Sequence, residues 1–203
     1  MKVYDLEGKN EKELLNNFLM EHQLEEKDVM YVCNTENAGI FKGKKSMIHL
    51  IKKEDVIDYI KEIFQEIEEI LNMKISVDVF CEEDTFKVNI DSEHNSILIG
   101  KDGKTLKALQ AILKQAIKSK CDFNIKLNLD VSNYKEKKLY HLEKLTRKLA
   151  NDVIKTKVDV KMDCMNSYER RYVHNIIAEY TMLTTKSEGI EPNRYVVIKY
   201  NED

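Results

Sequence analysis

Residues 54–131 switch repeatedly between the hydrophobic period of a helix and that of a strand, and this order of segments constrains the fold most. Two glycines, Gly100 and Gly103, interrupt the pattern between two helical segments. Apolar residues recur every three to four positions in the helical segments and alternate with polar residues in the strands. In chain order the pattern predicts a helix over Glu54–Asn72, a hairpin of strands Ile75–Phe80 and Phe86–Ile90, helices over His94–Ile99 and Lys104–Lys118, and a strand over Phe123–Val131.

The flanking segments predict two further small modules, so the whole chain is expected to be an α+β protein whose modules are joined by long helices. The first module contains strands Val3–Leu6, Val29–Asn34 and Ser46–Ile51, a helix over Glu11–His22 and a loop with two glycines over Asn37–Lys44. The last module contains a charged helix Asn133–Lys155, a strand Val158–Met162, a helix that Asn166 or Ser167 caps and that reaches about Met182, a loop Ser187–Asn193 and a strand Tyr195–Tyr200. The expected division is residues 1–52, a connector helix over 53–72, a central domain over 73–131 and a final domain over 132–203.

Charge is distributed unevenly between the two halves of the chain. Residues 1–95 contain 12 basic and 22 acidic side chains, a net charge of −10, whereas residues 96–203 contain 21 basic and 14 acidic ones, a net of +7. Such an asymmetry favours a nucleic-acid surface on the basic side, although lysine-rich solvated helix faces give the same count. The overall net charge of −3 conceals this asymmetry.

The segment Gly100-Lys101-Asp102-Gly103 has the chemistry of a phosphate clamp. Glycines let the backbone approach a bulky ligand without an intervening Cβ. The helix that follows offers free N–H groups and the positive end of its dipole to an anion. Lys101, Lys104 and Lys107 add positive charge, and Lys114 and Lys118 continue it along the helix. A pair of glycines can also mark an ordinary turn between helices.

A second pattern, Arg170 followed four residues later by His174, places two side chains on one face of the last predicted helix. We expect that face to lie beside the apolar stripe and to be exposed. A guanidinium group can bind a phosphate with two hydrogen bonds, and an imidazole can bind a phosphate or stack on a base. A histidine on a helix is more commonly a structural group, so the spacing alone does not decide between the two roles.

Both patterns resemble known nucleic-acid-binding domains. The helix and strand order around the GxxG loop resembles a type II KH domain, a fold whose GxxG loop clamps about four nucleotides of backbone. The Arg-x-x-x-His helix resembles the small R-three-H domain, and the downstream residues Ser187, Glu188, Gly189, Pro192 and Arg194 fit the closing segment of that domain. A KH domain leading into an R-three-H domain is the architecture of the Jag family, also called SpoIIIJ-associated or KhpB/EloR-type proteins. Residues 1–52 resemble the short N-terminal domain of that family.

The chain departs from the family pattern at a few positions. Lys42 stands where a glycine or small residue is usual, and Cys164 and Ser167 stand where prolines are common. Asp102 places a negative charge inside the GxxG loop and should weaken its attraction for phosphate. The resemblance implies that RNA contacts come from Gly100, Lys101, Asp102, Gly103, Lys104, Lys107, Arg170, Arg171, His174 and Arg194.

The resemblance also implies a partner and a cellular setting. It implies a non-enzymatic protein that binds single-stranded RNA and acts as a post-transcriptional regulator connected to cell elongation, division or envelope assembly. A small single-KH protein is the expected partner, and the long connector helix would permit a homodimer. The alternative is a scaffold in which residues 1–52 dock onto a partner or a membrane-associated complex.

Residues for catalysis or for binding a cofactor are not apparent in the sequence. The four cysteines are scattered without a CxxC spacing, and the histidines other than His174 have no second ligand at metal spacing, so we expect no metal, no cofactor and no catalytic residue. The first residues carry charges where a signal peptide needs an apolar run, and no stretch reaches the ~20 apolar residues of a membrane span. A cytoplasmic protein that is not integral to a membrane is therefore expected.

Overall fold

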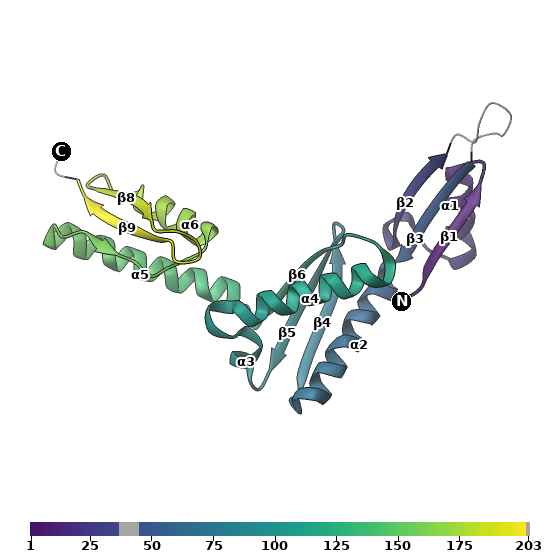
Figure 1. The fold of residues 1–203 in the computed structure, drawn as a ribbon, viewed down its shortest axis with the longest axis horizontal. Coiled ribbons are helices and arrows are strands. Elements are labelled where there is room, and N and C mark those ends of the chain that lie inside the picture. Colours follow the sequence, from purple (N-terminus) through teal and green to yellow (C-terminus); the bar gives the residue numbers. More distant parts are fainter. Residues whose placement is uncertain (37–44, 202–203) are drawn as a thin grey trace. The chain divides into compact units, whose positions relative to one another are not determined.

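The computed structural model describes residues 1–36 and 45–201, and the contacts among these residues group into two units, Met1–Ser132 and Asn133–Asp203 (Figure 1). Helices and strands occur in both units, which confirms the predicted α+β class. The glycine-bearing loop predicted over Asn37–Lys44 lies outside the described residues.

The first unit begins with a three-stranded antiparallel sheet in the order β1-β3-β2. Its strands are β1 (Val3–Gly8), β2 (Val29–Glu36) and β3 (Lys45–Lys52), and α1 (Glu11–His22) and a 3-10 turn at Glu26–Asp28 lie between β1 and β2. The helix begins where the sequence predicts, because the Asn10 side chain accepts a hydrogen bond from the backbone N–H of Lys12. The helix packs on the sheet around a core of Leu15, Phe18, Val29, Ile48 and Leu50.

The second sheet of the first unit has the order β4-β5-β6 and places the GxxG loop in a crossover connection. Its elements are α2 (Lys53–Leu71), β4 (Ile75–Glu82), β5 (Thr85–Ser92), α3 (Asn95–Ile99), a 3-10 turn at Lys101–Gly103, α4 (Lys104–Cys121) and β6 (Lys126–Val131). β4 and β5 are antiparallel, whereas β5 and β6 are parallel. Parallel neighbours need a long connection rather than a tight turn, and here α3 and α4 provide it. The predicted order of elements is confirmed.

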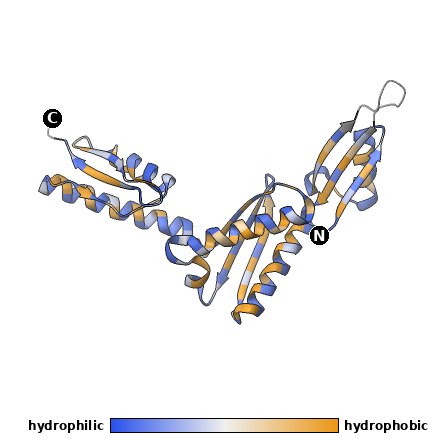
Figure 2. Ribbon diagram, viewed as in Figure 1, coloured by the Kyte–Doolittle hydropathy of each residue, from blue (hydrophilic) through white to orange (hydrophobic). Residues whose placement is uncertain are grey.

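One face of this second sheet is covered by helices. β5 buries Phe86, Val88 and Ile90 at alternate positions, as a strand with one covered face does. Phe64 of α2 and Leu113 of α4 are also buried almost completely, and Figure 2 shows hydrophobic and hydrophilic residues interleaved along α2. Each such side chain contributes roughly 1.5–3 kcal/mol through burial. This packing gives the GxxG loop a rigid support.

His49 connects the first sheet to the end of α4. Its Nδ1 lies 2.6 Å from Asp5 Oδ1, its Nε2 lies 2.9 Å from the carbonyl oxygen of Cys121, and its ring stacks on Phe123. Both ring nitrogens therefore face hydrogen-bond acceptors, and the imidazole must carry both protons to donate to each. The hydrogen bond to Asp5 is the main cause of a raised pKa for His49.

The second unit consists of α5 (Tyr134–Thr156), β7 (Val160–Lys161), α6 (Ser167–Ile177), β8 (Leu183–Glu188) and β9 (Tyr195–Tyr200). Its sheet has the antiparallel order β7-β9-β8, and α5 and α6 pack with it around Ala150, Val153, Met162, Val173, Ile177, Leu183, Val196 and Ile198. Asn166 caps α6 in a reciprocal arrangement with Glu169, as the sequence predicts for this start of the helix.

Three features of this unit differ from the sequence predictions. The helix that was expected to reach Met182 ends at Ile177, because tight turns through Tyr180 carry the chain into β8. β8 itself was not predicted: its sequence, LTTKSE, has a single large apolar residue and is recognisable as a strand only through its pairing with β9. The predicted strand Val158–Met162 shortens to the two residues of β7.

Candidate nucleic-acid interface

The GxxG loop is held in place by hydrogen bonds from Asn95 at the start of α3. The Asn95 side chain accepts from the backbone N–H of Ser92 at 2.9 Å and donates to Asp91 Oδ1 and to Ser132 Oγ, each at 2.9 Å. These contacts fix α3 to the ends of β5 and β6. Asn95 is not recognisable as a positioning residue from the sequence, because its partners come together only through the parallel register of the two strands.

Gly100 adopts a backbone conformation that other residues rarely reach. Its φ and ψ are 67° and 178°, and its N–H donates to the carbonyl oxygen of Ser96 at 2.9 Å. A Cβ at this position would lie 2.0 Å from Thr105 Oγ1 and 2.8 Å from Thr105 Cβ. Glycine is therefore required both by the torsion angles and by the close approach of Thr105.

Gly103 closes the loop and leads directly into α4. It is buried, has a φ of 80°, and donates its N–H to the carbonyl oxygen of Gly100 at 3.2 Å. Gly103 is the N-cap residue of α4 and has no side chain. No side chain therefore caps the N–H groups in the first turn of the helix. Such a helix start attracts anions.

Exposed lysines surround this helix start. Lys101, Lys104 and Lys107 are all exposed, and Asp102, also exposed and with a φ of 57°, is the one acidic side chain among residues 100–107. The loop therefore has a net positive charge despite Asp102. The structure brings together all six predicted contact residues of this region, which are Gly100, Lys101, Asp102, Gly103, Lys104 and Lys107.

The expectation that Arg170 is exposed is wrong. Its side chain is 8% exposed, its Nη1 donates to the carbonyl oxygen of Met165 at 2.8 Å, and its Nη2 lies 2.8 Å from Glu191 Oε1. Arg170 belongs to the buried face of α6, together with Glu169 and Val173. The guanidinium therefore ties the start of α6 to the loop before β9.

His174 is half-buried and also engaged within the unit. Its Nδ1 lies 2.6 Å from Thr185 Oγ1 and its Nε2 lies 2.8 Å from Ser187 Oγ, both on β8. Burial is the main cause of its lowered pKa, and the nearby charge of Arg170 adds to it. The lowered pKa favours the neutral form of this imidazole. The two hydroxyls were missed because β8 was missed.

Two further arginines of this unit have different surroundings. Arg171 is exposed, whereas Arg194 is half-buried. Within residues 1–36 and 45–201, Arg194 Nε is the one buried side-chain nitrogen or oxygen atom that has no hydrogen-bond partner. Tyr168, one turn before Tyr172 on α6, is 65% exposed. The structure thus separates the predicted set into the buried Arg170, the engaged His174 and the accessible Arg171.

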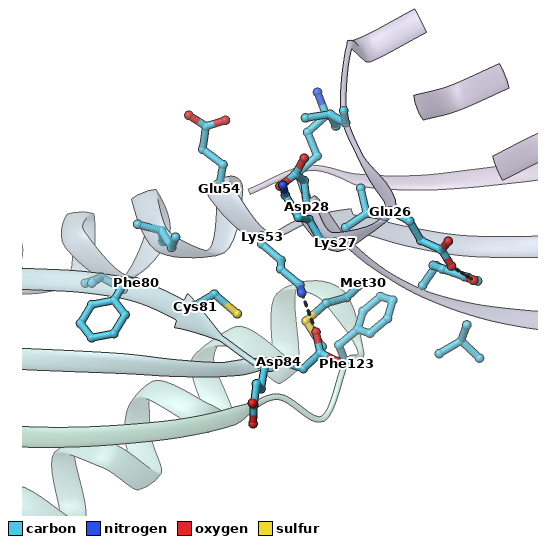
Figure 3. A pocket seen from close by; sticks show the side chains of 18 of the residues that line it. Glu26, Lys27, Asp28, Met30, Lys53, Glu54, Phe80, Cys81, Asp84 and Phe123 are labelled. Atoms are coloured by element: carbon cyan, nitrogen blue, oxygen red, sulfur yellow. Dashed lines mark hydrogen bonds and ion pairs between the residues drawn. The ribbon is translucent and has the colours of Figure 1, made fainter. Parts of the chain in front are cut away.

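A groove of about 1370 Å³ lies in the first unit, lined by the turn at Glu26–Asp28, by β2 and by the edge of β4 (Figure 3). Within it the Lys53 Nζ donates to Asp84 Oδ1 at 2.5 Å, and this ion pair is the main cause of a lowered pKa for Asp84. Met30 and Phe80 add apolar surface. Acidic side chains outnumber lysines among the described residues that line the groove, which makes it a poor site for a polyanion.

No group of three or more His, Cys, Asp or Glu side chains in residues 1–36 and 45–201 lies close enough together to hold a metal ion. None of the helices in the same ranges is long and apolar enough to cross a membrane.

Comparison with known protein families identifies two domains in this chain. Residues 53–130 match the model of the KhpA/KhpB KH domain, and residues 141–200 match that of the R-three-H domain. A protein named RNA-binding protein KhpB from Clostridium symbiosum is 29% identical over the whole chain and 94% of its own length. One of the same name from Bacillus subtilis (strain 168) is 33% identical, covering 80% of this chain and 79% of its own.

The chain is thus a KH protein with a following R-three-H domain. It belongs to the KhpB family, also known as the Jag family. The predicted family is confirmed.

Proposed function

We propose that this chain is a non-enzymatic protein that binds single-stranded RNA, with the GxxG loop clamping the sugar-phosphate backbone. The conformation of Gly100 carries the proposal: its lack of a Cβ lets the chain turn tightly into an uncapped helix start surrounded by Lys101, Lys104 and Lys107. Loops of this kind in KH domains hold about four nucleotides. The relatives are named RNA-binding proteins, which supports the same assignment.

The second unit contributes differently from what the sequence suggests. Arg170 and His174 shape the α6 surface from inside, so direct contacts fall to the exposed Arg171, to Tyr168 as a stacking ring and to Arg194 on the adjoining loop. In this proposal His174 positions β8 and does not contact phosphate. A post-transcriptional role connected to cell elongation, division or envelope assembly, with a small single-KH partner, extends the proposal on the basis of the family resemblance.

The groove of the first unit favours protein docking as a second candidate function. It presents the edges of β2 and β4, each paired on one side only within the described residues, and extended peptides can add to such edges. This function is compatible with RNA binding, because the groove and the GxxG loop use different residues.

Salt-dependent titration of labelled single-stranded RNA tests the proposed function. Each phosphate neutralised on a single strand contributes about −0.7 to the slope of log K against log salt, so a clamp on four nucleotides should give a slope of about −2 to −3. Double-stranded RNA of the same sequence serves as the control and should bind more weakly. A salt-independent affinity, or no binding at low salt, would contradict the proposal.

A further inference from the structure

The long helix α5 carries a row of lysines that the GxxG and α6 sites do not use. Lys137, Lys144, Lys148 and Lys155 are all exposed. With 100° of rotation per residue, the four lie within about 40° of one another around the helix axis, and they span about 27 Å along it. We refer to these four residues as the α5 lysine row.

The α5 lysine row faces away from the core of its own unit. The side chains of α5 that are buried most are Thr146, Ala150 and Val153, and the same geometry places them on the opposite side of the helix. The row is therefore not a by-product of packing within the unit, and its ammonium groups project from that unit.

The acidic groups near α5 are bound to other cations. Glu143 pairs with Arg147 at 2.9 Å, and Glu179 pairs with the same arginine at 2.8 Å. Glu169 pairs with Lys138 at 2.6 Å. Within the part of the chain that the structure describes, no carboxylate lies within ion-pair distance of any lysine of the row. The positive charge of the row is thus not cancelled by direct pairing.

Two acidic side chains of α5 flank the α5 lysine row. Asp152 is half-buried and lies about 60° round the axis from the centre of the row, and Glu136 lies about 100° away. Four unpaired cations against these two flanking carboxylates leave a net positive face.

An aromatic side chain accompanies the row. Tyr140 is 65% exposed and lies beside the first two lysines on the same side of the helix. Its ring meets that of His141 edge to face at 6.0 Å, and His141 Nδ1 is fixed by the carbonyl oxygen of Lys137 at 2.6 Å. An exposed ring held in this way, among unpaired cations, is the combination that binds single-stranded nucleic acid without sequence preference.

We propose that the α5 lysine row is a second contact site for the backbone of single-stranded RNA. The row binds several phosphates along one strand, and Tyr140 stacks on a base. This proposal rests on the proposed function, since it assumes that RNA is the ligand of the chain. An anionic membrane surface is a weaker fit, because a helix that binds membranes inserts its apolar face and the apolar face of α5 is occupied by the core.

The length dependence of binding distinguishes this site from the GxxG loop. The test uses the full chain, oligouridylate of five and of 20 nucleotides, and a variant with Lys137, Lys144, Lys148 and Lys155 replaced by glutamine. We expect the variant to bind the short strand as the wild type does. Its affinity for the long strand should fall on the order of tenfold or more, and the salt slope should shrink by about 2 to 3, since about four phosphate contacts are lost.

A charge-matched control separates the row from a general loss of charge. Replacing Lys9, Lys12, Lys61 and Lys74, which are exposed in the first unit, removes the same four charges and should leave both affinities unchanged. Circular dichroism of each variant checks the fold, and a milder double variant at Lys144 and Lys148 should show about half the change in slope.

Each outcome decides a separate question. If the wild type binds neither strand, the proposed function itself fails. If the wild type binds RNA but the row variant and the control variant bind the long strand equally, the α5 site is wrong and the GxxG proposal stands. If the row variant keeps its RNA affinity but loses binding to phosphatidylserine vesicles, the row binds a membrane instead.

Discussion

Reversing the charge of Lys101, Lys104 and Lys107 by glutamate substitution is expected to lower the affinity for single-stranded RNA by about a hundredfold at 0.1 M salt. Each lost phosphate contact lowers log K by about 0.7 for every tenfold by which the salt concentration lies below 1 M. At 0.1 M, three lost contacts therefore lower log K by about 2, and repulsion between glutamate and phosphate adds to the loss. All three side chains are exposed, so the fold should be retained. The loss is measured by fluorescence anisotropy with a short labelled strand.

A matched variant makes this result specific to the loop. Glutamate at Lys9, Lys12 and Lys61 changes the net charge of the chain by the same amount on exposed positions outside the loop. We expect its affinity to stay within about threefold of the wild type, since only long-range screened interactions change. Equal losses in both variants would mean that net charge, and not the GxxG loop, governs binding.

Replacing Gly100 by alanine is expected to destabilise the first unit by about 2–6 kcal/mol. Backbone strain at φ and ψ of 67° and 178° costs roughly 1–3 kcal/mol, and the clash of the new Cβ with Thr105 costs a similar amount. Because the chain forms two units, a local probe is needed, and amide hydrogen exchange in β5 and β6 reports on the unit that contains Gly100.

Two comparisons test the cause of this destabilisation. Lys101→Ala is a substitution in the same loop at an exposed position and should change stability by less than about 0.5 kcal/mol. Combining Gly100→Ala with Thr105→Ala removes Thr105 Oγ1, the atom nearest to the new Cβ, and should cost less than the sum of the two single changes. Strict additivity would show that the contact with Thr105 Oγ1 is not responsible.

The elements around the GxxG loop could be predicted from the sequence because their signals are local. Apolar and polar residues alternate on both sides of Glu83 and Asp84, and this pattern is sufficient to define the β4–β5 hairpin. In the structure both residues have the positive φ that a tight turn uses. The start of α6 is predictable to within one residue, because the sequence offers Asn166 or Ser167 as the N-cap, and the structure shows Asn166 in that role.

The parts that could not be predicted depend on contacts between distant residues. β8 becomes a strand through its partner β9, and its Thr185 and Ser187 then engage His174. Arg170 looks like a surface residue in the sequence, but Met165 and Glu191 hold its guanidinium in the interior. A spacing of four on a helix shows that two side chains share a face and does not show whether that face is covered.

The most direct test of RNA binding by the GxxG loop is to follow backbone amide signals of the full chain by NMR while a five-nucleotide single strand is added. The account predicts that the largest shifts occur within Gly100 to Lys107, where the first turn of α4 has no side-chain cap and lies among exposed lysines. Binding that leaves these amides unchanged and shifts signals elsewhere would contradict it.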